Sequence, residues 1–110
     1  MGLKRGDIVL VAPPGEFGKP RPALIIQSDA AFPSGYFTYL PITSDLLRVP
    51  NIRISLLPTP QNGLRLPSEI MVDMIQTSSS SKFNQTIGKI DTDTLQRIES
   101  ALNLHLGLDA

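Results

Sequence analysis

Short apolar runs alternate along this chain with turns rich in proline, glycine and asparagine. The runs contain many β-branched and aromatic residues, and some alternate apolar with polar positions, a pattern typical of strands. Proline and glycine between the runs are typical of turns. The pattern therefore predicts strands at residues 6–11, 23–27, 36–40, 51–56, 68–73 and 85–90.

The segments between these runs predict turns and loops. Asn62-Gly63 is a tight-turn signal. Residues 12–20 form a long connection, a length that is often functional. The connection at 28–35 has room for one short helical turn at 29–32. The polar serine tract at 77–82 is predicted to be exposed.

The segment after residue 90 predicts the one helix. Asp91 or Thr92 can cap its start, and Gly107 is a plausible stop. His105 falls in the last turn, where an imidazole interacts favourably with the helix dipole, so we interpret it as structural. The apolar face has a spacing of 3.6 residues and comprises Leu95, Ile98, Leu102 and Leu106. Leu104 and Leu108 lie off this face and suggest a second contact surface.

Several short strands followed by a single helix predict a mainly β (α+β) fold. The arrangement favours a small twisted antiparallel barrel with a C-terminal helix. A length of 110 residues is typical of a single domain, and we expect one domain over 1–110.

Composition narrows the function classes. The chain has no cysteine and one histidine, which predicts neither a disulfide framework nor a zinc site, and we expect no cofactor. A net charge of zero argues against binding long duplexes by bulk electrostatics. We find no membrane-spanning run and no secretory signal, so we expect a cytoplasmic protein. The one charge asymmetry is a basic cluster near the start, formed by Lys4, Arg5, Lys19 and Arg21.

Arg21 lies at the junction of a glycine- and proline-rich loop and an apolar run at 23–26 that reads as a strand buried on both sides. Its neighbours Pro20 and Pro22 each have a fixed φ, and Pro22 also keeps Arg21 out of the helical region. Pro22 has no amide proton, so we expect it at the first position of the strand. The backbone of Arg21 is therefore stiff, which suits a guanidinium that must be aimed. Most arginines at strand ends, however, are simply solvated.

Four segments in order resemble the MazF/PemK/Kid family of toxin–antitoxin ribonucleases. They are Lys4-Arg5-Gly6-Asp7-Ile8-Val9, the loop and strand entry from Gly15 to Ile25, Pro41-Ile42-Thr43-Ser44, and the segment from Pro67 to Thr77. Their order and spacing agree with the family over essentially the whole chain. The resemblance implies an SH3-like, CcdB/PemK-like toxin fold and an endoribonuclease that cleaves single-stranded mRNA without a metal.

The resemblance also assigns roles to residues of this chain. Arg21 and Thr43 correspond to the catalytic pair. The remaining positions of the RNA-binding groove are Glu16, Phe17, Lys19, Ser44, Ser68, Asp73 and Gln76. Phe17 can stack on a base or pack its own loop, and the sequence leaves both open.

The chemistry suits these residues. RNA carries its own nucleophile, the 2′-hydroxyl, so the protein must align that group and stabilise charge on the phosphoryl oxygens. A guanidinium matches phosphate geometry but is a poor base, so we assign Arg21 to transition-state stabilisation and proton donation. Thr43 can hydrogen-bond a phosphate oxygen or orient the 2′-hydroxyl, although Thr43-Ser44 is also an ordinary turn cap after a strand. The general base stays open.

Three positions depart from the family pattern. Met74 stands where the family often has glutamine, Gln76 where it often has arginine, and Met71 where some members carry a second arginine. These changes keep a second hypothesis open, a binding module without nuclease activity. That module would bind only its antitoxin or act on gyrase as the CcdB toxins do.

The resemblance further implies partners. We expect a symmetric homodimer with a groove along the subunit boundary, and a cognate antitoxin whose acidic, flexible tail occupies the RNA channel.

Overall fold

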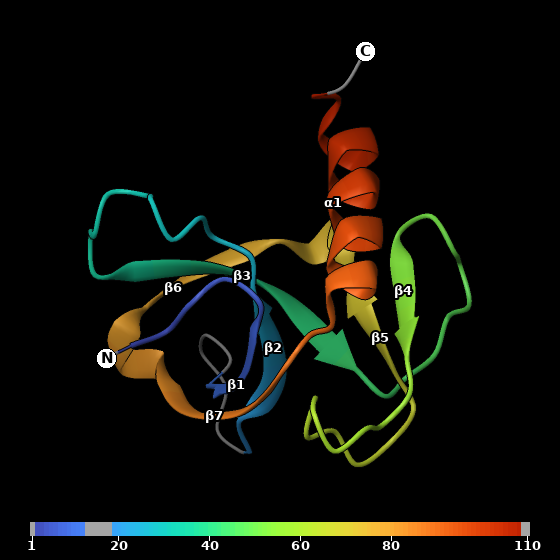
Figure 1. Cartoon of the computed structure of the whole chain (residues 1–110), viewed down its shortest axis with the longest axis horizontal. Helices are drawn as coiled ribbons and strands as arrows, with labels where there is room; N and C mark the ends of the chain where they lie inside the picture. The colour runs from blue at the N-terminus through green and yellow to red at the C-terminus, as the bar shows by residue number, and fades with distance from the viewer. Residues whose placement is uncertain (1, 13–18, 109–110) are drawn as a thin grey trace.

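The computed structural model describes residues 2–12 and 19–108. Seven strands and one α-helix make up the fold (Figure 1). The strands are β1 (Asp7–Val11), β2 (Arg21–Ile25), β3 (Tyr36–Thr43), β4 (Arg53–Leu56), β5 (Ser68–Met71), β6 (Gln76–Ser79) and β7 (Phe83–Lys89), and the helix is α1 (Thr92–Leu106). Two 3₁₀ turns, η1 (Val72–Met74) and η2 (Ser80–Lys82), flank β6.

The strands form one antiparallel sheet in the order β4-β5-β3-β2-β1-β7. The long strand β3 has two partners on the same side. Its first half, Tyr36 to Tyr39, pairs with β6, and its last residues, Ile42 and Thr43, pair with β5. The mainly antiparallel β fold with one C-terminal helix is thus confirmed. In the described part of the chain the two ends of this order do not pair, so closure into a barrel stays a prediction.

Both faces of the central strands are buried. Ile8, Leu24 and Leu40 point into one apolar cluster, whereas their neighbours Val9 and Ile25 point into the other. Helix α1 covers the first cluster through Ile98, Ala101 and Leu102. The second cluster is closed by Tyr39 and Phe83, whose rings meet edge to face at 5.6 Å. The continuous apolar run at 23–26 therefore has the two-sided burial that its sequence predicts.

Helix α1 begins and ends as predicted. The Asp91 side chain accepts a hydrogen bond from the Thr94 backbone N–H, and Gly107 ends the helix with a φ of +67°. Ile98 and Leu102 are buried, but Leu106 is 46% exposed, so the predicted apolar face is wrong at its last position. The reason is visible in Figure 1, where the C-terminal end of α1 runs past the edge of the sheet.

Several predicted boundaries need correction. The third strand continues to Thr43, because its last residues find a partner in β5. The first residue of β2 is Arg21, not Pro22 or Ala23. The connection at 28–35 contains a hydrogen-bonded turn, with the Ala31 N–H donating to the Ser28 carbonyl at 3.0 Å, and no helix.

The serine tract is the largest error of the sequence prediction. Residues 76–79 form β6, and Ser78 is buried. The first half of β3 needs a partner for its backbone groups, and a polar segment can supply one. Side chains add to the pairing, since the hydroxyls of Thr38 and Thr77 lie 2.8 Å apart.

The predicted tight turn at Asn62-Gly63 is confirmed. Gly63 has a φ of +71°, and a Cβ atom at this position would lie 2.1 Å from the Ile87 carbonyl oxygen. Asn62 is buried, and its Oδ1 accepts hydrogen bonds from the N–H groups of Thr59 and Leu64. The Lys89 N–H of β7 donates to the Gln61 carbonyl oxygen at 2.9 Å, which holds the β4–β5 connection against the sheet.

Candidate active site at the rim of strands β2, β3 and β5

Arg21 and Thr43 lie opposite each other across two neighbouring strands. In the β2–β3 pairing, Ala23 is opposite Pro41, Leu24 is opposite Leu40 and Ile25 is opposite Tyr39. Continuing this register by two residues places Arg21, the first residue of β2, level with Thr43, the last residue of β3. Directly opposite residues of antiparallel strands have Cβ atoms about 5 Å apart. The fold thus brings together the two residues that the sequence assigns to the catalytic pair.

The two side chains differ in burial. Arg21 is exposed, because the strand starts there and the chain before it leaves the sheet. Thr43 is half-buried, and Ser44 immediately after it is exposed. An exposed guanidinium beside a fixed hydroxyl can reach a substrate that lies across the rim.

The Thr43 hydroxyl is oriented by its own loop. Its Oγ1 accepts a hydrogen bond from the Asp45 backbone N–H at 3.0 Å. This is the turn cap that a threonine after a strand is expected to form. Since the oxygen serves as the acceptor here, the hydroxyl proton can be donated to a phosphate oxygen, and the structural and chemical roles are compatible.

Ser68 lies one strand further along, near the level of Ser44. In the β3–β5 pairing Ile42 is opposite Ile70 and Thr43 is opposite Glu69. Ser68 is buried, and its hydroxyl donates to the Leu66 carbonyl oxygen at 2.8 Å. The serine therefore fixes the start of β5, and contact with RNA stays a prediction for this residue.

Asp73 and Gln76 are not brought to this rim by the fold of the chain. Asp73 lies in η1, and its Oδ1 accepts a hydrogen bond from Arg53 Nε at 3.1 Å. Gln76 is opposite Tyr39, four residues before Thr43 in β3. At about 3.3 Å per residue this separation is about 13 Å. The Gln76 side-chain oxygen Oε1 accepts a hydrogen bond from the Tyr39 hydroxyl at 3.0 Å, so this side chain supports the second apolar cluster.

The remaining residues of the prediction lie in the loop before β2. Glu16 and Phe17 are outside the described residues. Lys19 is exposed two positions before Arg21 and adds a second cation to the same rim. Within residues 2–12 and 19–108, no group of three histidine, cysteine, aspartate or glutamate side chains is placed to hold a metal ion.

The sequence prediction missed Glu69. Its side chain is 1% exposed, and its two carboxylate oxygens accept hydrogen bonds from the backbone N–H groups of Leu47 and Arg48, each at 2.9 Å. A signal was present, because a glutamate stands inside the run Ser68-Glu69-Ile70-Met71-Val72, which otherwise reads as a buried strand. A buried charge in such a run requires partners.

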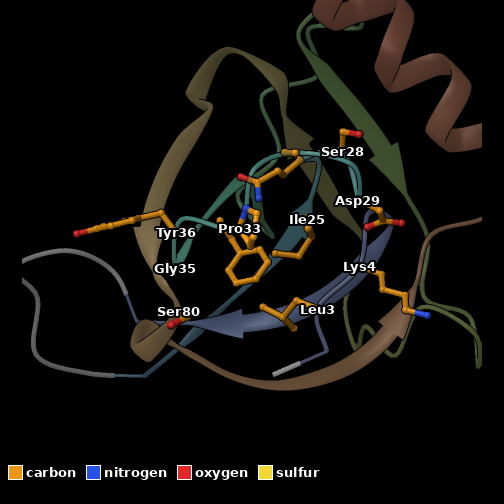
Figure 2. Close-up of a pocket in the computed structure, with 12 residues that line it drawn as sticks. Leu3, Lys4, Ile25, Ser28, Asp29, Pro33, Gly35, Tyr36 and Ser80 are labelled. Carbon is orange, nitrogen blue, oxygen red and sulfur yellow. The ribbon is translucent and has the colours of Figure 1, made fainter.

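A larger pocket lies away from this rim. It has a volume of about 680 Å³ and lies between the N-terminal segment and the 28–35 connection, at the end of β2 opposite to Arg21. Leu3, Ile25 and Tyr36 are among the residues that line it, and Figure 2 shows the end of the Tyr36 side chain directed outward. None of the residues that line it belongs to the predicted catalytic or RNA-binding set.

Known proteins with related sequences are MazF toxins. A probable endoribonuclease MazF of Mycolicibacterium smegmatis is 36% identical over 107 residues, which cover 96% of this chain and 98% of that protein. Endoribonuclease MazF9 of Mycobacterium tuberculosis is 27% identical over 116 aligned positions, with 96% of this chain and 98% of the relative covered.

Solved structures share the fold over nearly the whole chain. The Mycobacterium tuberculosis toxin MazF-mt6 superposes with a TM-score of 0.77 at 24% identity and covers 94% of this chain and 99% of its own. A mycobacterial endoribonuclease in complex with its cognate antitoxin gives a TM-score of 0.80 at 19% identity, covering 99% of both chains. At these identities the likeness shows the fold alone.

The model of one family matches residues 4–106, which include every described residue of the rim. Its description is "PemK-like, MazF-like toxin of type II toxin-antitoxin system". The order of motifs and the antiparallel sheet with its terminal helix agree with this match. The chain therefore belongs to the PemK-like, MazF-like family of toxins of type II toxin–antitoxin systems.

Proposed function

We propose that this toxin is a sequence-selective endoribonuclease of the cytoplasm that cleaves single-stranded mRNA without a metal ion. The observation that supports this most is the cross-strand placement of Arg21 opposite Thr43 at an open rim. The relatives named as endoribonuclease MazF provide the reaction class.

In the proposed reaction the RNA supplies the nucleophile. The 2′-hydroxyl gives its proton to a general base, its oxygen attacks the adjacent phosphorus, and the bond from phosphorus to the 5′-oxygen breaks. The products are a 2′,3′-cyclic phosphate and, once the leaving oxygen has taken up a proton, a 5′-hydroxyl. Arg21 stabilises the charge that builds on the phosphoryl oxygens and can donate a proton to the leaving oxygen. Thr43 donates a hydrogen bond from its hydroxyl to a phosphoryl oxygen. Its own oxygen already accepts a hydrogen bond from the Asp45 N–H, which orients the hydroxyl.

We propose a homodimer as the functional unit. Apolar side chains are exposed at the end of α1 and beside η1, namely Met74, Ile75, Leu104, Leu106 and Leu108. Ile75, Leu106 and Leu108 line one groove of about 330 Å³ along the helix. A second copy of the chain would cover this surface, and its Asp73 and Gln76 would then contribute to a channel shared by the two subunits.

The proposed partner is an antitoxin with an acidic, flexible segment. Lys19 and Arg21 are exposed together at the rim, so an acidic peptide and an RNA backbone would compete for the same cations. The structural neighbour that was solved with its cognate antitoxin supports a partner of this class. Binding of the peptide should weaken as salt concentration rises.

The test is a cleavage assay with mapped ends. Purified chain is incubated with mRNA in EDTA, and both new ends are identified by sequencing and by end-specific labelling. We expect cleavage at a short recognition sequence, with cyclic phosphate and 5′-hydroxyl ends. Cleavage that is absent, or that strictly requires added magnesium, would refute the proposal, and a parallel gyrase supercoiling assay would then test the CcdB-like alternative.

A further inference from the structure

Glu69 belongs to the same cross-strand row as the proposed catalytic pair. The β3–β5 register places Glu69 directly opposite Thr43, and the β2–β3 register places Thr43 opposite Arg21. Directly opposite residues point to the same face of a sheet. The row Arg21–Thr43–Glu69 therefore runs along one face of the rim, and Glu69 is its fully buried member.

A loop that starts at the catalytic threonine covers Glu69. Residues 44, 45 and 47–50 of this loop are exposed, yet the glutamate beneath is 1% exposed. Its Oε1 accepts the Leu47 N–H and its Oε2 accepts the Arg48 N–H, both at 2.9 Å. Hydrogen bonds from N–H groups to an ionised acceptor are stronger than those to neutral ones.

Arg48 is the position at which the loop turns back. It is the one described non-glycine residue with a positive φ, at +63°, a region that side chains other than glycine rarely adopt. A residue persists in such a conformation when its surroundings hold it there. The bond between the Arg48 N–H and the Glu69 carboxylate provides that restraint.

We propose that Glu69 is a positioning residue for RNA cleavage, which holds the 44–48 loop and thereby fixes the Thr43 hydroxyl beside Arg21 and restrains Ser44 next to it. The loop is fastened at its start by the bond from Asp45 to Thr43 and at its turn by the two bonds to Glu69. The first of these bonds spans Ser44, which leaves this residue little freedom. The inference rests on the proposed function, because it concerns the same hydroxyls.

The geometry assigns Glu69 to positioning and not to proton transfer. Each of its oxygens already accepts a backbone N–H, and the side chain is shielded from the surface. A general base must be within hydrogen-bond reach of the proton that it removes. The Glu69 oxygens are within hydrogen-bond distance of two backbone amides, but they are shielded from a substrate bound at the open rim.

The test compares four variants of the full chain in the cleavage assay. In Glu69→Ala both acceptors are lost, and we expect kcat to fall about 10- to 100-fold because small displacements of aligned groups are costly. Since the rim still binds RNA, KM should change less than about twofold. Glu69→Gln keeps one acceptor and should fall between wild type and Glu69→Ala.

The third variant adds Arg48→Gly to Glu69→Ala. Glycine adopts a φ of +63° without strain, so the loop would need less restraint. We expect the double variant to regain at least about threefold in kcat over Glu69→Ala. A residue that only stabilises the fold would not be rescued by a change in the loop.

Asp91→Ala is the matched control. Asp91 is also a carboxylate that accepts a backbone N–H, but it does so at the start of α1. This variant should lose stability and keep the wild-type kcat. If Glu69→Ala, measured while folded, has the kcat of the Asp91→Ala control, or if the double variant shows no recovery, the positioning role is wrong.

Amide hydrogen exchange separates this inference from the proposed function. In Glu69→Ala the Leu47 and Arg48 amides should exchange at least about tenfold faster, with Ile42 and Ile70 unchanged. Unaltered exchange at residues 47 and 48 would overturn the inference even if wild type cleaves RNA. If wild type cleaves no RNA, the proposed function and the catalytic part of this inference both fail, and the exchange rates still decide whether Glu69 holds the loop.

Discussion

The two ends of strand β2 differ in shape and in chemistry. The Ile25 end of β2 borders the 680 Å³ pocket of Figure 2, which has an apolar floor. At the end of Arg21 the molecule presents an open rim, where a guanidinium, a fixed hydroxyl and a buried carboxylate form one row across three strands. A concave pocket suits a small molecule. A polymer that is cut in the middle must lie across an open surface, so we place the proposed site at the aimed groups of the rim and not at the pocket.

Of the substitutions at the two ends of β2, replacing Arg21 should have the largest effect on the cleavage rate. Arg21→Ala removes the guanidinium that, in the proposed reaction, stabilises the phosphoryl charge, and we expect cleavage to fall by about 10²- to 10³-fold or more. Because Arg21 is exposed at a strand end, the thermal midpoint should change little. The measurement is single-turnover cleavage beside circular dichroism. A folded Arg21→Ala protein that cleaves at the wild-type rate would remove the rim from the mechanism.

Replacing Thr43 should have the second largest effect on the cleavage rate. Thr43→Val keeps the shape and loses both the donor and the acceptor for the Asp45 N–H, so we expect cleavage to fall by about 10- to 100-fold. Thr43→Ser keeps the hydroxyl and should stay within about tenfold of wild type. Rates measured at saturating RNA separate a loss of chemistry from a loss of binding. Equal rates for the valine and serine variants would contradict a role for the hydroxyl.

Replacing Asp91, which caps the start of α1, should lower the stability of the fold without changing the cleavage rate. Hydrogen bonds from the Thr94 side chain and backbone lower the pKa of Asp91 below its ordinary value of 3.8. A lowered folded-state pKa means that this contribution is present above about pH 3.8 and is lost as pH falls through the folded value. Asp91→Ala should cost about 1 kcal/mol of unfolding free energy at pH 7.

Denaturant unfolding from pH 7 to pH 2.5 checks this. The difference between wild type and Asp91→Ala should be constant near neutrality and shrink in the acid range. A difference that grows as pH falls would show that the sign is wrong.

The smallest effect is expected at the pocket end of β2. Asp29 lines the pocket, and its Oδ1 accepts the Arg5 N–H at 2.8 Å. Asp29→Asn keeps the side-chain carbonyl as acceptor and removes a charge from the pocket. We expect its cleavage rate to stay within about twofold of wild type, since surface changes away from a site are usually mild. A loss comparable to that of Thr43→Val would mean that the pocket takes part in the reaction.

The sequence predicted the strands best where local pattern and tertiary environment agree. The apolar run of β2 and the capped helix α1 contain their own signals. The serine segment of β6 does not, because its strand conformation comes from pairing with β3. Leu106 was misplaced for a similar reason, since the helical period gives a face but not where the sheet beneath it ends.

The residues of the candidate site also fall into two groups, those that sequence motifs indicate and those whose contacts only the fold shows. Arg21 and Thr43 stand in recognisable motifs, and the register places them opposite each other. Glu69 also stands in a motif segment, but its role depends on amides of Leu47 and Arg48, more than twenty residues earlier in the chain. No spacing rule connects these positions. The separation of Asp73 and Gln76 from the rim likewise follows from the path of β3 and the two partners that share it.

The central claim is that this rim aligns the substrate's own 2′-hydroxyl. The most direct measurement uses two short RNA oligonucleotides that carry the mapped cleavage sequence, identical except for a single 2′-deoxynucleotide on the 5′ side of the cut bond. The account predicts that wild-type protein cleaves the all-RNA strand in EDTA and leaves the substituted bond intact, while both strands bind with similar affinity. Cleavage of the substituted bond at the same rate would contradict it.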